Sequence, residues 1–373
     1  MRLSELKTGQ SATILNVLGH GGFRRRIMEM GFVRGKRVDV LQNAPLRDPI
    51  KYRIMDYEVS LRRSEAAMIV VITAEEVQQQ LSVAGETLSA PDDADFEEAI
   101  STRSRTINVA LIGNPNSGKT SLFNAISGGH EHVGNYSGVT VYAKRGEYRY
   151  GGYRFVITDL PGTYALSAYT PEELYVRRHL VNDTPDVVVN AVVASNLERN
   201  LYLTTELIDI DPKMVVALNM YDELEASGAV LDYEHLGAML GVPMVPVVAK
   251  TGRGLETLLD TVIAVYENRD PRVRHIHINN GPVVEQALRP LYERLRSDRD
   301  ELPKHFPPRY FAMKLLERDK EVEAQLADCP HFAEWIALRD RAVPQVEEEL
   351  GEDVETALAN QKYGFISGAL KET

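Results

Sequence analysis

Residues 113–120 read Gly-Asn-Pro-Asn-Ser-Gly-Lys-Thr, and they directly follow an apolar run over residues 107–112. A short buried strand that opens into such a turn and continues into a helix, here over 121–126, is the setting in which this pattern binds phosphate. Gly113 and Gly118 let successive backbone N–H groups point inward at phosphate oxygens, aided by the positive end of the helix. The sequence therefore predicts a phosphate-binding loop.

Two side chains of this loop have expected roles. Lys119 would reach the β- and γ-phosphates, and the hydroxyl of Thr120 would ligate Mg²⁺. The residues expected to surround the phosphates are Gly113, Asn114, Asn116, Ser117, Gly118, Lys119, Thr120 and Ser121.

A second apolar run, over 155–158, ends in Asp159-Leu160-Pro161-Gly162, the D-x-x-G pattern of nucleotide-hydrolysing proteins. We expect Asp159 to hold Mg²⁺ through water and the Gly162 N–H to sense the γ-phosphate. Thr163 follows Gly162, so no Gln stands where related hydrolases orient the attacking water. Unaided hydrolysis should therefore be slow, or helped in another way.

Two further strands, expected over 214–218 and 245–248, deliver a guanine-reading pattern. The Asp222 carboxylate can accept the ring N–H and exocyclic amino protons of guanine, which adenine does not offer in that arrangement. A backbone N–H after the later strand could meet the guanine carbonyl. The residues predicted to contact the base are Asn219, Met220, Asp222, Ala249 and Lys250.

The stretch between the phosphate loop and the D-x-x-G pattern is rich in glycine and contains Thr140. Its position makes Thr140 the candidate switch residue, whose hydroxyl and carbonyl complete the Mg²⁺ and γ-phosphate shell only in the triphosphate state.

These motifs, with 133–141 and the run Ser-Asn-Leu-Glu-Arg-Asn-Leu-Tyr-Leu at 195–203, resemble the G domain of the bacterial ferrous-iron transporter FeoB. The resemblance implies GTP hydrolysis stimulated by K⁺, which Asn116 and the backbone of the switch segment would ligate in place of an arginine finger. The catalytic residues it implies are Asn116, Lys119, Thr140 and Gly162. Two positions depart from the family pattern and bear on K⁺ stimulation: Tyr136 replaces a Trp, and Val193 stands where Asp is common.

Length and composition point to an intracellular chain of two or three domains. A chain of 373 residues exceeds the size at which one core keeps growing, and its single cysteine, Cys329, excludes a disulfide framework and a Cys-based metal cluster. No run approaches the roughly eighteen apolar residues of a bilayer span, and no signal peptide is evident. FeoB, however, is a membrane protein, and residues 363–367 resemble the segment before its first membrane helix. We therefore expect the cytosolic portion of a longer polypeptide, at the cytoplasmic face of a bacterial membrane, with that protein's own transmembrane region as partner.

Charge divides the chain. Residues 1–74 hold 13 Lys/Arg and 7 Asp/Glu, a net charge of +6. Because the whole chain has a net charge of −12, the remaining residues carry −18. A basic module on an acidic body suggests docking onto the G or helical domain or onto anionic lipid, although a solvated basic face is the commoner meaning. Short alternating apolar runs at 11–17, 37–41, 57–61 and 67–72, separated by Gly and Pro, predict the strands of a small antiparallel barrel. The run 25–32 and the Asp48-Pro49 pair resemble FeoA, the small SH3-like partner of FeoB.

The remaining segments complete the predicted organisation. Residues 75–105 are acidic and polar, typical of a flexible linker. Beyond about residue 270, apolar residues recur at helical spacing among many Glu and Arg, as in the helical domain of FeoB. Four dispersed histidines, which we expect to be surface or packing residues, are His275, His277, His305 and His331. The expected fold is an α/β P-loop GTPase domain at 106–269, preceded by an SH3-like barrel at 1–74 and followed by a helical domain at 270–373.

Two alternatives share part of this evidence. A soluble GTPase of ribosome or RNA assembly would carry the same nucleotide motifs, but it should also carry a basic RNA-binding domain, whereas the chain after the linker is acidic. A metal-responsive regulator could use the SH3-like module, but no helix-turn-helix or ligand cluster is evident in the sequence. We therefore expect no nucleic-acid partner, and the sequence leaves homo-oligomer formation open.

Overall fold

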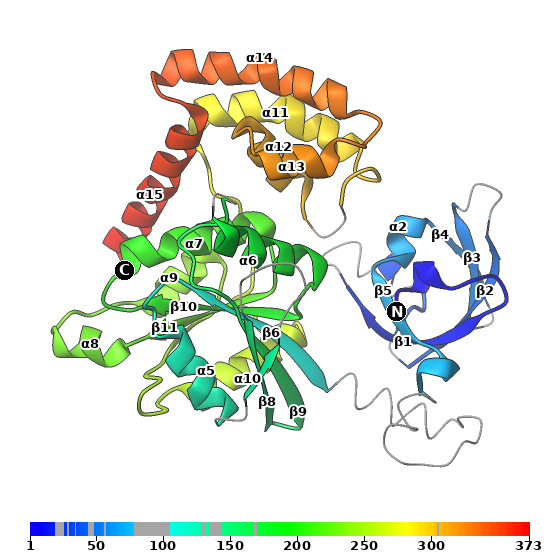
Figure 1. Cartoon of the computed structure of the whole chain (residues 1–373), viewed down its shortest axis with the longest axis horizontal. Coiled ribbons are helices and arrows are strands. Elements are labelled where there is room, and N and C mark those ends of the chain that lie inside the picture. The colour runs from blue at the N-terminus through cyan, green and yellow to red at the C-terminus, as the bar shows by residue number, and fades with distance from the viewer. Residues whose placement is uncertain are drawn as a thin grey trace. The chain divides into compact units, whose positions relative to one another are not determined.

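The structure is a computed structural model that describes residues 1–18, 26–27, 30–33, 35–43, 48–55, 57–77, 105–128, 131–134, 143–167, 170–303 and 306–373. It divides into two compact units, Met1–Thr106 and Ile107–Thr373 (Figure 1). Thr140, Tyr136, His305 and most of the expected linker lie outside the described residues.

The first unit is built on a five-stranded antiparallel sheet with strand order β4-β3-β2-β1-β5. Its strands are β1 (Ser11–Val17), β2 (Arg37–Asn43), β3 (Ile50–Ile54), β4 (Tyr57–Leu61) and β5 (Ile69–Ile72). The short helices are η1 (Leu3–Glu5) and α2 (Arg63–Ala66). Fully buried side chains, among them Ile14, Phe32 and Tyr52, form a core of their own. The predicted small antiparallel domain is thus confirmed, although β3 was not anticipated.

The second unit is organised around a seven-stranded sheet with order β12-β11-β10-β6-β9-β8-β7. Its strands are β6 (Thr106–Gly113), β7 (Glu131–Gly134), β8 (Ala143–Tyr150), β9 (Tyr153–Asp159), β10 (Val187–Val193), β11 (Met214–Asn219) and β12 (Met244–Pro246). Strand β10 pairs in parallel with both β6 and β11, and β11 with β12. Strands β7, β8 and β9 pair antiparallel at the other edge. Because neighbouring parallel strands end at the same edge of a sheet, Gly113 at the end of β6 and Asn219 at the end of β11 lie at one edge, separated by strand β10.

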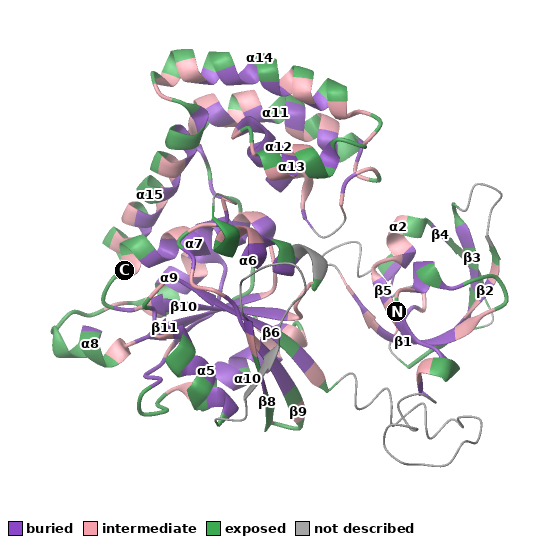
Figure 2. Cartoon of the chain, in the orientation of Figure 1, coloured by how far each residue is buried: buried purple, intermediate pink, exposed green. Residues whose placement is uncertain are grey.

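The central strands β6, β10 and β11 are buried on both faces, which Figure 2 shows as a mostly purple centre. Residues of β6 alternate between two clusters: Ala110 and Ile112 belong to one, and Val109 and Leu111 to the other. This alternation is the two-residue period of a strand, and near-continuous apolar sequence is what a sheet covered by helices on both faces requires.

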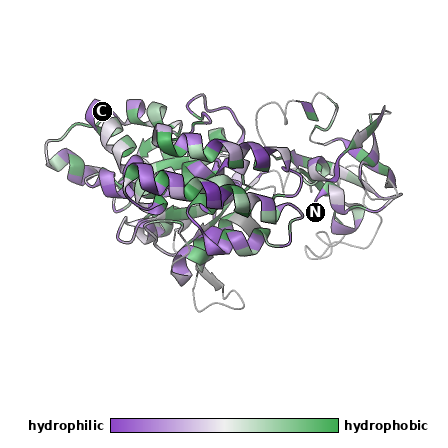
Figure 3. Ribbon diagram, turned by 90° about the horizontal axis from the view of Figure 1, so that it is seen from above, coloured by the Kyte–Doolittle hydropathy of each residue, from purple (hydrophilic) through white to green (hydrophobic). Residues whose placement is uncertain are grey.

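Helices cover both faces of this sheet and then form a separate layer (Figure 1). They are α5 (Lys119–Ser127), α6 (Pro171–Asn182), α7 (Leu197–Ile210), α8 (Tyr221–Ala226), α9 (Tyr233–Leu240), α10 (Leu255–Tyr266), α11 (Gly281–Ser297), α12 (Pro308–Leu316), α13 (Lys320–Leu326), α14 (Phe332–Leu350) and α15 (Val354–Glu372). Their hydrophilic and hydrophobic residues alternate along each ribbon in Figure 3, as one-sided burial demands. Among the described residues, no helix is long and apolar enough to cross a membrane.

The predicted helical region is confirmed in α11, which buries Val284, Leu288, Leu291 and Leu295 at the expected spacing. The same apolar cluster extends without a break from these residues into one face of the sheet. The helices after residue 270 therefore share a hydrophobic core with the seven-stranded sheet and the helices on that face.

A buried cluster of charges also joins these two parts. Lys362 of α15 pairs with Glu206 of α7, and its Nζ lies 2.8 Å from Asp209 Oδ2. Lys314 of α12 lies 3.6 Å from Glu206 and 2.6 Å from Glu317. Burial alone would raise the pKa of Glu206, but Lys314 and Lys362 lower it to about 2. The charged form of Glu206 is therefore held by its two lysine partners, although the carboxylate lies in the interior.

Candidate nucleotide-binding site

The phosphate loop occupies the turn between β6 and α5, and its backbone requires glycine. Gly118 is the N-cap of α5 and has a φ of +73°. A Cβ added there would lie 2.3 Å from Asn219 Nδ2, and one added at Gly113 would lie 2.6 Å from the Ala191 carbonyl oxygen. Because Gly118 provides no capping side chain, the N–H groups of the first turn of α5 face the loop without a cap.

Two buried polar atoms of the loop point to a ligand. Asn114 Oδ1 and Ser117 Oγ are buried and have no hydrogen-bond partner among the described residues. Buried polar atoms normally have a partner, so their lack of one fits a loop that is completed by phosphate oxygens or water. Asn116 is exposed beside them with a φ of +65°, a conformation that Asn tolerates better than most residues.

Lys119 and Asp159 form an ion pair at the base of the loop. Their exposed fractions are only 8% and 7%, so the charges are largely withdrawn from water. Burial raises the pKa of Asp159, and the nearby Lys119, together with a hydrogen bond from Thr120, offsets only part of this rise. Three predicted phosphate and Mg²⁺ residues therefore lie together, and two of them are hard oxygen donors suited to Mg²⁺.

The D-x-x-G segment lies directly against the phosphate loop. The Thr163 N–H donates to the Gly113 carbonyl at 3.2 Å. A Cβ on Gly162 would approach Pro115 Cα to 3.1 Å, so this close contact favours glycine. The backbone N–H expected to sense the γ-phosphate is thus positioned beside the loop.

The predicted base-reading residues meet at the ends of β11 and β12. Asn219 does not point outward; its amide donates to the Ser117 carbonyl at 2.9 Å and accepts from the Ala249 N–H at 3.2 Å. It therefore fastens the base-reading turns to the phosphate loop. Asp222 and Lys250 are both exposed, so a base could reach them from solvent. Met220 adopts a left-handed φ of +55°.

Two contacts at the site were not anticipated from sequence. The Asn114 side chain donates to the Arg199 carbonyl at 3.4 Å. The Arg199 guanidinium lies over the Tyr164 ring, 4.4 Å from its centroid. Arg199 belongs to the run 195–203, which sequence reasoning singled out without assigning it a contact. It now connects the phosphate loop to the segment after D-x-x-G through the first turn of α7.

A Gly-rich loop between a buried strand and a helix, a buried Lys–Asp pair and a tethered Asn-x-x-Asp turn define a P-loop GTPase domain. The family models give the particular class: "Ferrous iron transport protein B" matches residues 107–262, the "FeoA domain" residues 1–73, and the "FeoB cytosolic helical domain" residues 281–373. The chain belongs to the FeoB family, with a FeoA domain fused at its N-terminal side.

Relatives agree with this assignment. The chain is 48% identical over 396 residues to the Fe(2+) transport protein A/Fe(2+) transporter FeoB fusion protein of Porphyromonas gingivalis. The matched region covers 100% of this chain and 47% of that relative. It is 36% identical over 269 residues to the Fe(2+) transporter FeoB of Methanocaldococcus jannaschii, covering 72% of this chain and 39% of the relative. The chain thus spans about half or less of the length of these relatives.

Solved structures show the same fold. NFeoB from S. thermophilus bound to GDP.AlF4- and K+ is 36% identical, covers 71% of this chain and 99% of its own, and superposes with a TM-score of 0.61. The cytosolic domain of T. maritima FeoB in apo form is 32% identical, covers 72% of this chain and 98% of its own, and gives 0.60. The predicted fold class and family are confirmed.

Proposed function

We propose that residues 106–269 bind GTP and hydrolyse it to GDP and phosphate, with Mg²⁺ at Thr120 and Asp159. The observation that carries this proposal is the buried Lys119–Asp159 pair beneath a loop whose Asn114 and Ser117 oxygens lack partners. A phosphate chain would pair with the Lys119 ammonium, and a divalent cation with the Asp159 carboxylate.

In this proposal, Lys119 turns from Asp159 to the β- and γ-phosphates and neutralises charge as it develops there. The carboxylate of Asp159 and the hydroxyl of Thr120 would hold Mg²⁺, which would neutralise negative charge on the phosphates. The uncapped N–H groups at the start of α5 complete the cradle. Thr140, outside the described residues, would close the site in the triphosphate state. Lys119→Ala should abolish hydrolysis, measured as phosphate release.

Guanine selectivity is assigned to Asp222. Losing a charge-assisted pair to the base costs about 1.5–3 kcal/mol, so Asp222→Asn should weaken GTP and GDP binding by about one to two decades. Glu225→Gln in the same helix is the matched control, because Glu225 instead pairs with the exposed Arg253. Titration of both variants with GTP and ATP tests the assignment, and unchanged GTP and GDP affinities in Asp222→Asn would show it to be wrong.

Hydrolysis should be faster in KCl than in NaCl. Asn116 is exposed on the loop, and an amide oxygen there suits K⁺ better than the smaller, more tightly hydrated Na⁺. K⁺ would supply transition-state charge that neither a Gln nor an Arg of the D-x-x-G segment provides. The solved S. thermophilus NFeoB is bound to GDP.AlF4- and K+, which supports the proposal.

The test of K⁺ stimulation uses Asn116→Gly, because glycine keeps the left-handed backbone while removing the amide. The variant should retain GDP affinity and lose the difference between the two salts. Equal wild-type rates in KCl and NaCl would contradict the proposal, and the Tyr136 and Val193 positions make this measurement informative for the family.

The wider role we propose is that of the cytosolic part of a ferrous-iron transporter, on the cytoplasmic side of a bacterial membrane. The FeoB and FeoA family models and the named relatives support it. In the complete transporter, Lys119→Ala should remove nucleotide-dependent uptake of radioactive Fe²⁺ into cells. Uptake at the wild-type rate, with the variant present at equal abundance, would contradict this role.

For residues 1–74 we propose a regulatory docking module that binds the G or helical domain in a salt-sensitive way. Residues 1–74 carry +6, and the rest of the chain, including the linker at 75–105, carries −18, so weak charge complementarity suffices at high effective concentration. Compared with a shorter chain beginning at Ser101, the full chain should differ a few-fold in GDP release or turnover at low salt. Identical kinetics and independent tumbling of the module by NMR would refute docking.

A further inference from the structure

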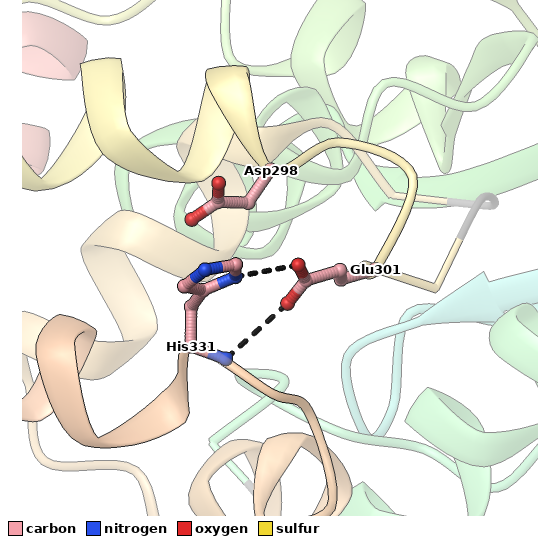
Figure 4. Close-up of side chains that lie close together, drawn as sticks. All are labelled: Asp298, Glu301 and His331. Atoms are coloured by element: carbon pink, nitrogen blue, oxygen red, sulfur yellow. Dashed lines mark hydrogen bonds and ion pairs between the residues drawn. The ribbon is translucent and has the colours of Figure 1, made fainter.

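Three metal-ligating side chains meet where α11 ends and α14 begins, far from the phosphate loop in sequence (Figure 4). Asp298 is the C-cap of α11, Glu301 lies in the following turn, and His331 is the N-cap of α14. One ligand atom of each lies within 4.8 Å of the others. His331 Nδ1 is 2.5 Å from Glu301 Oε1, and the Glu301 carboxylate also accepts from the His331 backbone N–H at 3.4 Å.

The cluster is held by a rigid frame. Trp335 is fully buried, and its indole Nε1–H donates to Asp298 Oδ2 at 2.8 Å. Arg294 reaches the other oxygen, Oδ1, at 3.1 Å. Asp298 itself is only 9% exposed. Outer hydrogen bonds that fix a carboxylate in this way orient it as a ligand and reduce the entropy lost when a cation binds.

The surroundings of the cluster favour positive charge. The Cys329 thiol next to the cluster donates to the Glu301 backbone carbonyl at 3.4 Å and adds no charge of its own. Arg294 is the opposing cation, but it is divided between Asp298 and Glu334, which lies 2.9 Å away. The negative charge of the Asp298 and Glu301 carboxylates is therefore only partly compensated by Arg294.

We propose that Asp298, Glu301 and His331 form a binding site for a divalent first-row transition-metal cation. One imidazole nitrogen with two carboxylate oxygens suits Zn²⁺, Co²⁺ or Fe²⁺, whereas Mg²⁺ and Ca²⁺ favour all-oxygen sets. The cation binds between the His331 imidazole and the two carboxylates, and a proton on the coordinating nitrogen is released to solvent when it binds. Binding fastens the end of α11 to the start of α14. The site is separate from the proposed Mg²⁺ site at Thr120 and Asp159.

The chain carries its own reporter for this site, because Trp335 is its single tryptophan and contacts Asp298 directly. The experiment titrates the full chain with Co²⁺ while saturating GDP and Mg²⁺ occupy the nucleotide site. We expect saturable quenching of Trp335 fluorescence at one equivalent, reversed by Zn²⁺ and unaffected by excess Mg²⁺. Co²⁺ absorption bands in the visible range should grow with the same midpoint.

Two variants separate metal binding from an ordinary capping pair. His331→Asn keeps a residue that caps helices well, and Asp298→Asn keeps an oxygen for the Trp335 N–H; each should weaken Co²⁺ binding at least tenfold. His275→Asn is the matched control, since His275 also pairs with a carboxylate, that of Asp211 at 2.9 Å, outside the cluster. No saturable quenching, or quenching unchanged by both variants, overturns the proposal, as does loss of quenching in the His275 control alone.

Discussion

Replacing Lys362 with Met should destabilise the second unit more than any single change at its surface. Lys362 is 1% exposed and is the ammonium shared by Glu206 and Asp209. Its removal leaves two carboxylates of α7 in the interior with only Lys314, 3.6 Å from Glu206, to balance them and Glu317. Removing one partner of a buried ion pair costs about 3–5 kcal/mol, mainly because the other charge stays buried without compensation.

The structure also predicts an asymmetry within the cluster. Glu206→Gln leaves Lys362 paired with Asp209 at 2.8 Å and Lys314 paired with Glu317 at 2.6 Å, so each remaining carboxylate keeps one ammonium partner. Its cost should be about 1.5–3 kcal/mol, that of charge-assisted hydrogen bonds replaced by neutral ones. The Lys362→Met deficit should shrink as the pH falls from 7.5 to 5, because an unpaired buried carboxyl can then take up a proton.

Urea unfolding, followed by the fluorescence of Trp335, measures these costs in the second unit alone. Arg253→Met is the matched control, because it removes a cation from an ion pair with Glu225 whose side chains are 52% and 50% exposed, and it should change stability by less than about 1 kcal/mol. A Lys362→Met cost no larger than that of the control, or one smaller than that of Glu206→Gln, would refute the reasoning.

Three further outcomes follow from the site and its neighbours. Gly118→Ala should abolish GDP binding in a titration, because its Cβ would lie 2.3 Å from Asn219 Nδ2 and its φ is +73°; Gly228→Ala, with a φ of +76° and nothing within 4 Å, controls for backbone strain alone. Asn219→Ala should weaken GDP binding at least tenfold, because the Ser117 carbonyl and Ala249 N–H lose their shared partner. Burial, with nearby cations, lowers the pKa of His277 below its ordinary 6.5, so the fold favours neutral imidazole. Its contribution to stability is present above pH 6.5 and declines as the pH falls toward the lowered pKa, and His277→Asn should flatten this decline in urea unfolding.

The nucleotide site was predictable because its signals are local. A strand, a Gly-rich turn and a helix occupy consecutive residues, so the loop at 113–120 could be placed from periodicity and glycine positions alone. The sequence also indicated that Asn219 and Ala249 belong together, since both follow strands of one parallel sheet. What it did not indicate was that Asn219 would fasten the loop through the Ser117 carbonyl, a contact between residues about a hundred positions apart.

Contacts over long sequence separations account for the rest. Glu206 and Lys362 are 156 residues apart, and neither helix carries a motif that identifies a partner. His331 was expected to be an isolated surface or packing residue, yet the turn after α11 places Glu301 and Asp298 beside it. Strand β3 was missed even though Ile50, Tyr52 and Ile54 alternate with Lys51 and Arg53, the pattern of a strand buried on one face. Thr140 lies outside the described residues, so its role stays a prediction.

Helix α7 has a mechanical consequence. At its first turn, Arg199 contacts both Asn114 and Tyr164. Further along, Tyr202 stacks on Tyr363 of α15, with ring centroids 5.0 Å apart. Arg199 and Tyr202 are three residues apart, about 4.5 Å along the helix axis, so a single turn of α7 joins the two contacts. We therefore expect a displacement of α7 beside the phosphate loop to move the contact with α15 as well, and a displacement of α15 to reach the loop.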